Sequence, residues 1–167
     1  ELPKVYETVR EWLSEHNITL TEIYKPENWK LLWQMQNDIL DRKIKEESEL
    51  KSFVSDRTVI DSYLYTKIHL RQYLSKIELS DYLDKCQIHF NRVYDLIFFV
   101  PLFSNKIKDD GCRILDIEYQ QNFEKELWRI LNSLENVYKI KSLSEQARLN
   151  EIIPIIRNRF KERVIYA

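Results

Sequence analysis

The most constraining feature of the sequence is a short run of consecutive apolar residues near its middle. Residues 95–101 read DLIFFVP, and every position from Leu96 to Val100 is apolar. An unbroken apolar run of this length is typical of a parallel strand buried on both faces. Pro101 ends the run, because proline cannot donate to a strand ladder. A strand buried on both faces needs helices on both sides, so the run predicts a layered α/β domain.

Short strands and amphipathic helices alternate along the rest of the chain. Further strands are predicted at Lys4–Tyr6, Ser52–Val54 and Val137–Ile140. Apolar residues at helical spacing predict helices at Glu7–Glu15, from Pro26 to about Lys51, from Thr58, from Ser80, at Ile114–Leu134 and from Ser144. No repeat, low-complexity stretch or linker interrupts this order. We therefore expect one helix-rich domain, residues 1–167, with a mostly parallel sheet.

Two stretches carry more detailed expectations. Residues 42–49 are nearly all charged, so the end of the second predicted helix is expected to lie in solvent. The last helix is expected to bury a stripe of apolar residues: Leu149, Ile152, Ile153, Ile156 and Phe160. Pro154 lies within that helix and is expected to kink or divide it, because proline removes a helical hydrogen bond.

The charge balance gives no reason to expect nucleic acid or a membrane as a partner. The 26 Lys and Arg residues nearly match the 27 Asp and Glu residues, which leaves a formal net charge of −1. No apolar run is long enough to span a bilayer, and no signal peptide is visible, so a cytoplasmic location is expected. Cys86 and Cys112 form no CxxC pair and no zinc set with the histidines. They are expected to be reduced thiols.

The functional prediction depends most on the stretch from Lys51 to Tyr65, KSFVSDRTVIDSYLY. Asp56 and Arg57 follow the predicted strand and precede a helix, and α/β folds bind ligands at the carboxyl ends of such strands. Thr58 and Asp61 fit a weaker form of the capping box. The stretch therefore predicts a site of the phosphoryl-transfer type. Nucleotide-binding α/β proteins cluster glycines in their first loop. This sequence has no such cluster, because Gly111 is its only glycine.

Four blocks of the sequence resemble a known family. Their residues are Val5–Arg10, Phe53–Asp61, Tyr94–Pro101 with Asp110–Arg113 and Asp116, and Ser144–Arg148. They are similar to the P-loop AAA-domain proteins of the nucleoside-kinase-like branch, whose relatives include bacterial nicotinamide-riboside kinases. Gln146 departs from the acid that is usual at its position. The resemblance implies a P-loop kinase-like three-layer α/β fold.

One departure from the family pattern is larger. The family begins with a strand and a G-x-x-x-x-G-K-[ST] loop, and no lysine of this sequence follows a glycine. Because that strand is central in the family's sheet, we expect this sequence to be incomplete at its N-terminus by about 30 residues, the size of a βαβ unit. A natural, catalytically inactive remnant is the alternative.

The resemblance also implies roles for the residues around the predicted strand end. Asp56 would hold Mg²⁺ or accept a proton from the attacking hydroxyl; the alternative is an acid that favours the helix N-terminus. Arg57 would bind the transferring phosphate, or else form an ion pair with Asp61 or Glu7. Glu7 and Arg10 would face the acceptor substrate, with an i, i+3 surface pair as the alternative. Asp61 fits a cap better than a substrate contact.

The remaining implied residues belong to the second half of the chain. Arg113 would be a lid arginine that neutralises phosphate charge. Asp110, Gly111 and Asp116 would form the rest of that lid, and a solvated loop is the alternative. Arg148 fits a helix surface, with contact to the nucleotide base as the second possibility.

These roles together predict an enzyme that uses ATP and Mg²⁺. It would transfer the γ-phosphoryl group of ATP to a nucleoside-like or other small hydroxyl acceptor. One alternative is a catalytically inactive nucleotide-binding or protein-interaction module of the same fold. Another is an ATPase whose hydrolysis drives a partner. The acceptor and the oligomeric state stay open.

Overall fold

The structure is a computed structural model that describes residues 2–6, 8–102 and 116–161. Its described residues fall into two compact units, one formed by residues up to Val93 and the other by residues from Tyr94 onward. Glu7, Asp110, Gly111 and Arg113, to which the sequence assigned roles, lie outside the described residues.

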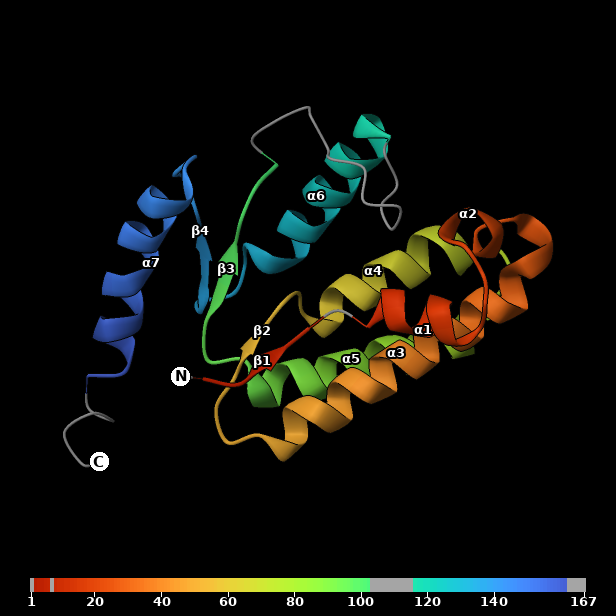
Figure 1. The fold of residues 1–167 in the computed structure, drawn as a ribbon, viewed down its shortest axis with the longest axis horizontal. Helices are drawn as coiled ribbons and strands as arrows, with labels where there is room; N and C mark the ends of the chain where they lie inside the picture. The colour runs from red at the N-terminus through yellow and green to blue at the C-terminus, as the bar shows by residue number, and fades with distance from the viewer. Residues whose placement is uncertain (1, 7, 103–115, 162–167) are drawn as a thin grey trace. The chain divides into compact units, whose positions relative to one another are not determined.

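The first unit contains two short strands and most of the long helices. Figure 1 shows its elements in order. They are β1 (Lys4–Val5), α1 (Val9–Glu15), α2 (Leu20–Ile23), the 3₁₀ turn η1 (Pro26–Asn28), α3 (Trp29–Glu49), β2 (Val54–Ser55), α4 (Val59–Leu70) and α5 (Lys76–Val93). The second unit contains β3 (Ile97–Phe99), α6 (Ile117–Leu131), β4 (Val137–Lys139) and α7 (Glu145–Arg159). Each of the predicted strands therefore has a counterpart: three are shorter than predicted, and β2 shares only Val54 with the predicted strand Ser52–Val54.

Strand pairing is parallel in both units. β1 pairs with β2 with Val5 opposite Ser55, and β3 pairs with β4 with Phe98 opposite Tyr138. The described strands form two separate two-stranded sheets, where the sequence predicted a single one. The mixed α/β class is thus present in a loose, helix-rich form, and the three-layer arrangement of a P-loop kinase stays a prediction.

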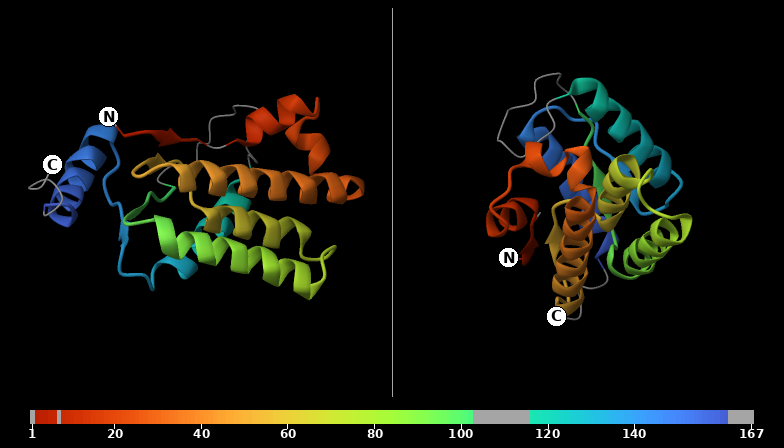
Figure 2. Two further views of the ribbon diagram at one scale, coloured as in Figure 1. Left: turned by 90° about the horizontal axis from the view of Figure 1, so that it is seen from below. Right: turned by 90° about the vertical axis from the view of Figure 1, so that its right-hand side faces the viewer.

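Three helices build the core of the first unit. Figure 2 shows α3, α4 and α5 side by side, and each contacts the other two. α3 buries Leu32, Gln36 and Ile39 at helical spacing. The short helices α1 and α2 add Trp12 and Ile23, which are fully buried against the first half of α3. β1 is followed by α1 and β2 by α4, so the packing of these two helices also positions the two strands.

The core of the second unit lies between α6 and its strand pair. Phe123, Leu127 and Leu131 form the buried face of α6, and the ring of Trp128 lies 5.0 Å from that of Phe99 on β3. The side chain of Asn136 donates to the backbone oxygen of Tyr94 at 2.8 Å, which joins the starts of the two strands.

Local hydrogen bonds explain where helix boundaries differ from the predicted ones. α5 begins at Lys76 and not after Ser80, because Ser75 and Glu78 cap each other reciprocally at 2.8 and 3.2 Å. Between the first two predicted helices lies α2, which was not predicted and which begins with a capping box of Thr19 and Glu22. Pro154 does not divide the last helix, which continues from Glu145 to Arg159.

The stripe of the last helix differs most from its prediction. α7 contains no buried residue, and Leu149, Ile153 and Ile156 are exposed. No helix within the described ranges has the length and apolar character needed to cross a bilayer.

Candidate functional site

The turn from β2 into α4 carries the residues to which the sequence gave catalytic roles. β2 is fixed against β1 by two backbone hydrogen bonds of 2.9 Å, from Val54 N to the Pro3 oxygen and from Asp56 N to the Val5 oxygen. Because the pair is parallel, the chain after β1 and the chain after β2 both leave at the carboxyl edge of this sheet. Asp56 and Arg57 lie at that edge, as predicted.

Asp56 presents its carboxylate to solvent. The residue is exposed, and no hydrogen bond or ion pair of its carboxylate occurs within the described part of the chain. Its backbone is held from two sides, because its N–H donates to Val5 and its carbonyl oxygen accepts from Lys43 Nζ at 3.2 Å. The result is an accessible acid on a fixed backbone.

Arg57 has an unusual backbone conformation. Its φ is 67°, in the left-handed region that residues other than glycine rarely occupy. The guanidinium turns back onto α4, where Nη1 donates to the hydroxyl of Tyr65 at 2.9 Å and Cζ lies 5.4 Å from the centre of the same ring. Tyr65 in turn stacks on His69, and burial lowers the pKa of His69 to about 4. A positively charged side chain thus lies on a neutral aromatic pair.

Asp61 is a helix cap, which is the role that the sequence favoured. Its Oδ2 accepts from the backbone N–H and from the hydroxyl of Thr58, both at 2.9 Å. The Thr58 hydroxyl accepts from Ile60 N at 3.2 Å, which satisfies another amide of the first turn. A substrate contact by Asp61 therefore has only Oδ1 available.

The other predicted site residues lie on elements outside the β2–α4 turn. Arg10 is exposed on α1. Asp116 caps α6 by accepting from Tyr119 N at 3.0 Å. Arg148 is half-buried on α7, and its Nε donates to the backbone oxygen of Ser142 at 3.2 Å. The last two belong to the second unit, so the structure does not place them against Asp56.

A buried polar network beneath the turn was not predicted. Lys43 and Glu47 on α3, which the sequence placed in solvent, are buried together with His89 on α5. Ser55 on β2 donates to Glu47 Oε1 at 2.6 Å and accepts from Lys43 Nζ at 2.7 Å. Glu47 Oε2 lies 2.7 Å from His89 Nε2, and Oε1 lies 3.3 Å from Lys43 Nζ.

The sequence did contain a signal for this network. Positions 32, 36, 40, 43 and 47 continue one helical stripe of α3. A lysine and a glutamate four residues apart on the buried side of a helix are the natural pair to compensate each other's charge. The pair fixes α3 against β2, and through Lys43 it also fixes the backbone of Asp56.

The described residues contain no preformed metal cluster of three or more His, Cys, Asp or Glu ligands. The exposed carboxylate of Asp56 fits Mg²⁺ nonetheless, because this ion keeps several waters and usually takes one or two carboxylates together with substrate phosphates. Comparisons with protein-family models, with curated proteins and with solved structures gave no match.

Proposed function

We propose that the chain is part of an ATP-dependent kinase or ATPase of the P-loop class, which transfers the γ-phosphoryl group of ATP to a small, nucleoside-like acceptor. The observation that carries the proposal is the position of Asp56. Its exposed carboxylate lies at the carboxyl end of a parallel strand, directly before a helix, which is where α/β folds bind ligands. The resemblance of the sequence 53–61 to the kinase block supports the same assignment.

Asp56 is the proposed acid–base and metal residue. A carboxylate at this point would accept the proton of the attacking hydroxyl or bind the waters of Mg²⁺. When bound, the metal would neutralise charge on the transferring phosphoryl group. Lys43 would keep the carboxylate in place through its hydrogen bond to the Asp56 carbonyl oxygen.

Arg57 is the proposed charge-stabilising residue beside it. A left-handed arginine costs about 1–3 kcal/mol of backbone strain, and such strain gathers at functional sites. In the proposed reaction the guanidinium would leave Tyr65 and bind phosphate oxygens through its fork of donors.

The remaining predicted roles belong to the same proposal. Arg113 would neutralise phosphate charge, with Asp110, Gly111 and Asp116 in its lid, while Glu7 and Arg10 would shape the acceptor pocket. Arg148 would contact the nucleotide base. The proposed location is the cytoplasm, where ATP is abundant, and neither nucleic acid nor a membrane is a proposed partner.

A non-catalytic module is the second candidate. One observation favours it: the sequence has one glycine and no G-x-x-x-x-G-K-[ST] loop, so these residues do not themselves supply the usual cradle for ATP phosphates. Such a module would bind nucleotide, or a protein, without turnover.

The first test compares the intact mass of the purified protein with the 20.5 kDa of these residues. ATP consumption is then measured with and without a panel of nucleosides. Turnover that needs a nucleoside supports the kinase, and turnover without one supports an ATPase. Binding without turnover supports the module.

A pair of variants locates the site. Asp56→Asn is expected to lower kcat by about 10²–10⁴-fold, the usual contribution of a general base. Glu135→Gln, which removes an exposed carboxylate in the second unit, is the matched control and is expected to keep the full rate. If Asp56→Asn keeps the full rate as well, the assignment of Asp56 is wrong.

A further inference from the structure

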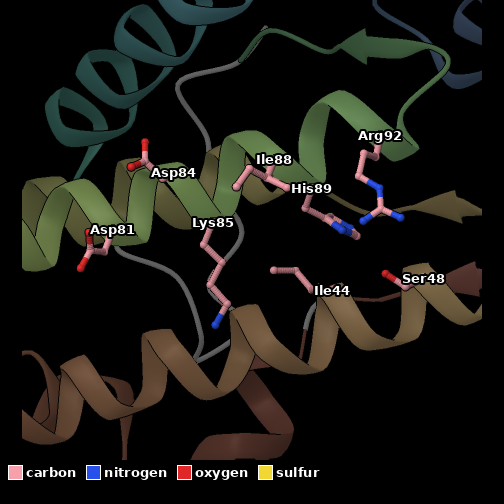
Figure 3. Close-up of a pocket in the computed structure, with 8 residues that line it drawn as sticks. All are labelled: Ile44, Ser48, Asp81, Asp84, Lys85, Ile88, His89 and Arg92. Atoms are coloured by element: carbon pink, nitrogen blue, oxygen red, sulfur yellow. The ribbon is translucent and has the colours of Figure 1, made fainter.

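A groove between α3 and α5 forms a separate pocket in the first unit. Its volume is about 410 Å³, within the range of small-molecule sites. Figure 3 shows the residues that line it. They are Ile44 and Ser48 on α3, and Asp81, Asp84, Lys85, Ile88, His89 and Arg92 on α5. None of them belongs to the proposed phosphoryl-transfer site.

The buried network fixes the wall of this groove. His89 is 6% exposed, and its Nε2 lies 2.7 Å from the carboxylate of Glu47. Because a carboxylate accepts hydrogen bonds, Nε2 is the donor, and the ring is held in one orientation. Glu47 is itself held by Lys43 and Ser55. The groove is therefore backed by side chains that need no rearrangement when a ligand binds.

One end of the groove carries two hydrogen-bond donors, the Arg92 guanidinium and the Ser48 hydroxyl, beside the ring of His89. In Figure 3 the Arg92 guanidinium lies at the same end as the His89 ring and the Ser48 hydroxyl. Arg92 is exposed, and within the described ranges its side chain makes no ion pair or hydrogen bond. A planar fork of donors without a protein acceptor matches a carboxylate or a phosphate group.

The middle of the groove is apolar, and its other end carries both signs of charge, because Asp81 and Asp84 are exposed there beside Lys85. Ile44 and Ile88 lie between its two ends, and Ile88 is 62% exposed. At the other end, Lys85 forms an ion pair with Asp41. The carboxylate of Asp84 points away from α3 in Figure 3. The groove therefore offers a cationic end followed by an apolar wall.

We propose that this groove binds a small organic anion with a short apolar body. Arg92 holds the carboxylate or phosphate group, Ser48 donates to it, and Ile44 and Ile88 pack against the apolar part. The site acts independently of ATP turnover, so binding here does not depend on the proposed function.

The test is a titration of the ¹⁵N-labelled protein with four six-carbon probes, followed by amide chemical shifts. The probes are hexanoate, hexyl phosphate, 1-hexanol and hexylamine. The two anions are expected to bind saturably with Kd on the order of 1 mM, the affinity expected for ligands of this size. Shifts should cluster on α3 and α5, and a difference between the two anions identifies the preferred head group. The alcohol and the amine are expected to bind at least fivefold more weakly.

Matched variants decide whether the groove is the site. Arg92→Gln and Ile88→Asn are expected to weaken anion binding at least fivefold, and both change exposed side chains. Arg71→Gln and Ile77→Asn change comparably exposed residues outside the groove and are expected to bind as the parent does. Ile88→Ala replaces Ile88→Asn if that variant unfolds. Absent saturation, equal binding of hexylamine, or unchanged Kd in Arg92→Gln overturns the proposal. Asp56→Asn should bind the anions normally, which separates this result from the kinase test.

Discussion

At the scale of single residues, Glu47 is a buried charge of the first unit that needs several partners. It is 1% exposed and carries a carboxylate that contacts Lys43, Ser55 and His89. Removing a charge from water costs several kcal/mol, and its partners offset that cost only while all of them are in place. Each member of the network is therefore more costly to remove than a comparable surface charge.

Glu47→Gln is expected to destabilise the protein by about 3 kcal/mol, because it leaves the Lys43 ammonium buried without its counter-charge. Urea unfolding followed by tryptophan fluorescence measures this, since Trp12, Trp29 and Trp33 all belong to the first unit. The control is Glu46→Gln, an exposed neighbour, with an expected change within about 0.5 kcal/mol. If Glu47→Gln changed the free energy of unfolding as little as this control is expected to, the network would contribute nothing measurable to stability.

His69 gives the protein a pH dependence of known sign. Burial among the rings of Tyr24 and Tyr65 lowers its pKa to about 4, below the usual 6.5. The unfolded chain therefore binds this proton first as the pH falls. The stability due to neutral His69 is complete above pH 6.5 and is lost between pH 6.5 and about 4.

Between pH 7 and pH 5 the parent protein is expected to lose about 1–2 kcal/mol through His69, and His69→Gln should not show this part of the loss. Urea midpoints at pH 8, 7, 6 and 5 measure the difference. The two proteins should have nearly parallel stability from pH 8 to 7, where folded His69 gains no proton and unfolded His69 gains only a small fraction of one. Identical slopes below pH 6.5 would contradict the assignment.

At the scale of elements, local signals predicted most of what the structure contains. The Thr58 and Asp61 cap, the Ser144 cap and the run 96–100 each depend on neighbours in sequence, and each is present. The predicted burial of α7 and the predicted exposure of Lys43 and Glu47 were wrong for one reason, whereas Lys45, Glu46, Ser48 and Glu49 are exposed as expected. Periodicity shows that a helix has two faces, but not whether another element covers either of them.

The residues of the candidate site divide in the same way, into those that local sequence predicted and those that only the fold brings together. The β2–α4 turn with Asp56 could be read from the sequence because a strand, an acid and a cap are adjacent there. The network of Lys43, Glu47 and His89 joins α3 to α5, so only the fold brings its members together. The left-handed conformation of Arg57 has no sequence signal, since arginine gives no indication of it.

The contrast between α7 and the buried helices leads to a direct prediction. Leu40 on α3 is fully buried, whereas Ile153 on α7 is 39% exposed. Leu40→Ala is expected to cost about 2–5 kcal/mol of the free energy of unfolding, and Ile153→Ala less than about 1 kcal/mol. Urea unfolding measured by circular dichroism tests both. A cost above about 2 kcal/mol for Ile153→Ala would show that its side chain is buried in solution.

At the scale of the whole molecule, the net charge predicts which class of partner the protein does not attract. The net charge of −1 and a pI of about 6.4 provide no long-range attraction for a polyanion. The local exception is the end of α7, where Arg157, Arg159 and Lys161 follow one another closely. Cations at this end also match the negative end of the helix dipole, so their presence has a structural reason.

We therefore expect weaker binding to nucleic acid than the non-specific Kd of about 10⁻⁴–10⁻⁶ M that DNA-binding proteins show at physiological salt. Fluorescence anisotropy with a labelled 20-base-pair DNA duplex and a single-stranded RNA, at 150 mM salt, measures this. Micromolar binding that strengthens steeply at lower salt would contradict the prediction. The variant with Gln at 157, 159 and 161 then locates the contact, because a loss of binding there would make the end of α7 a polyanion site, whereas unchanged binding would place it elsewhere on the chain.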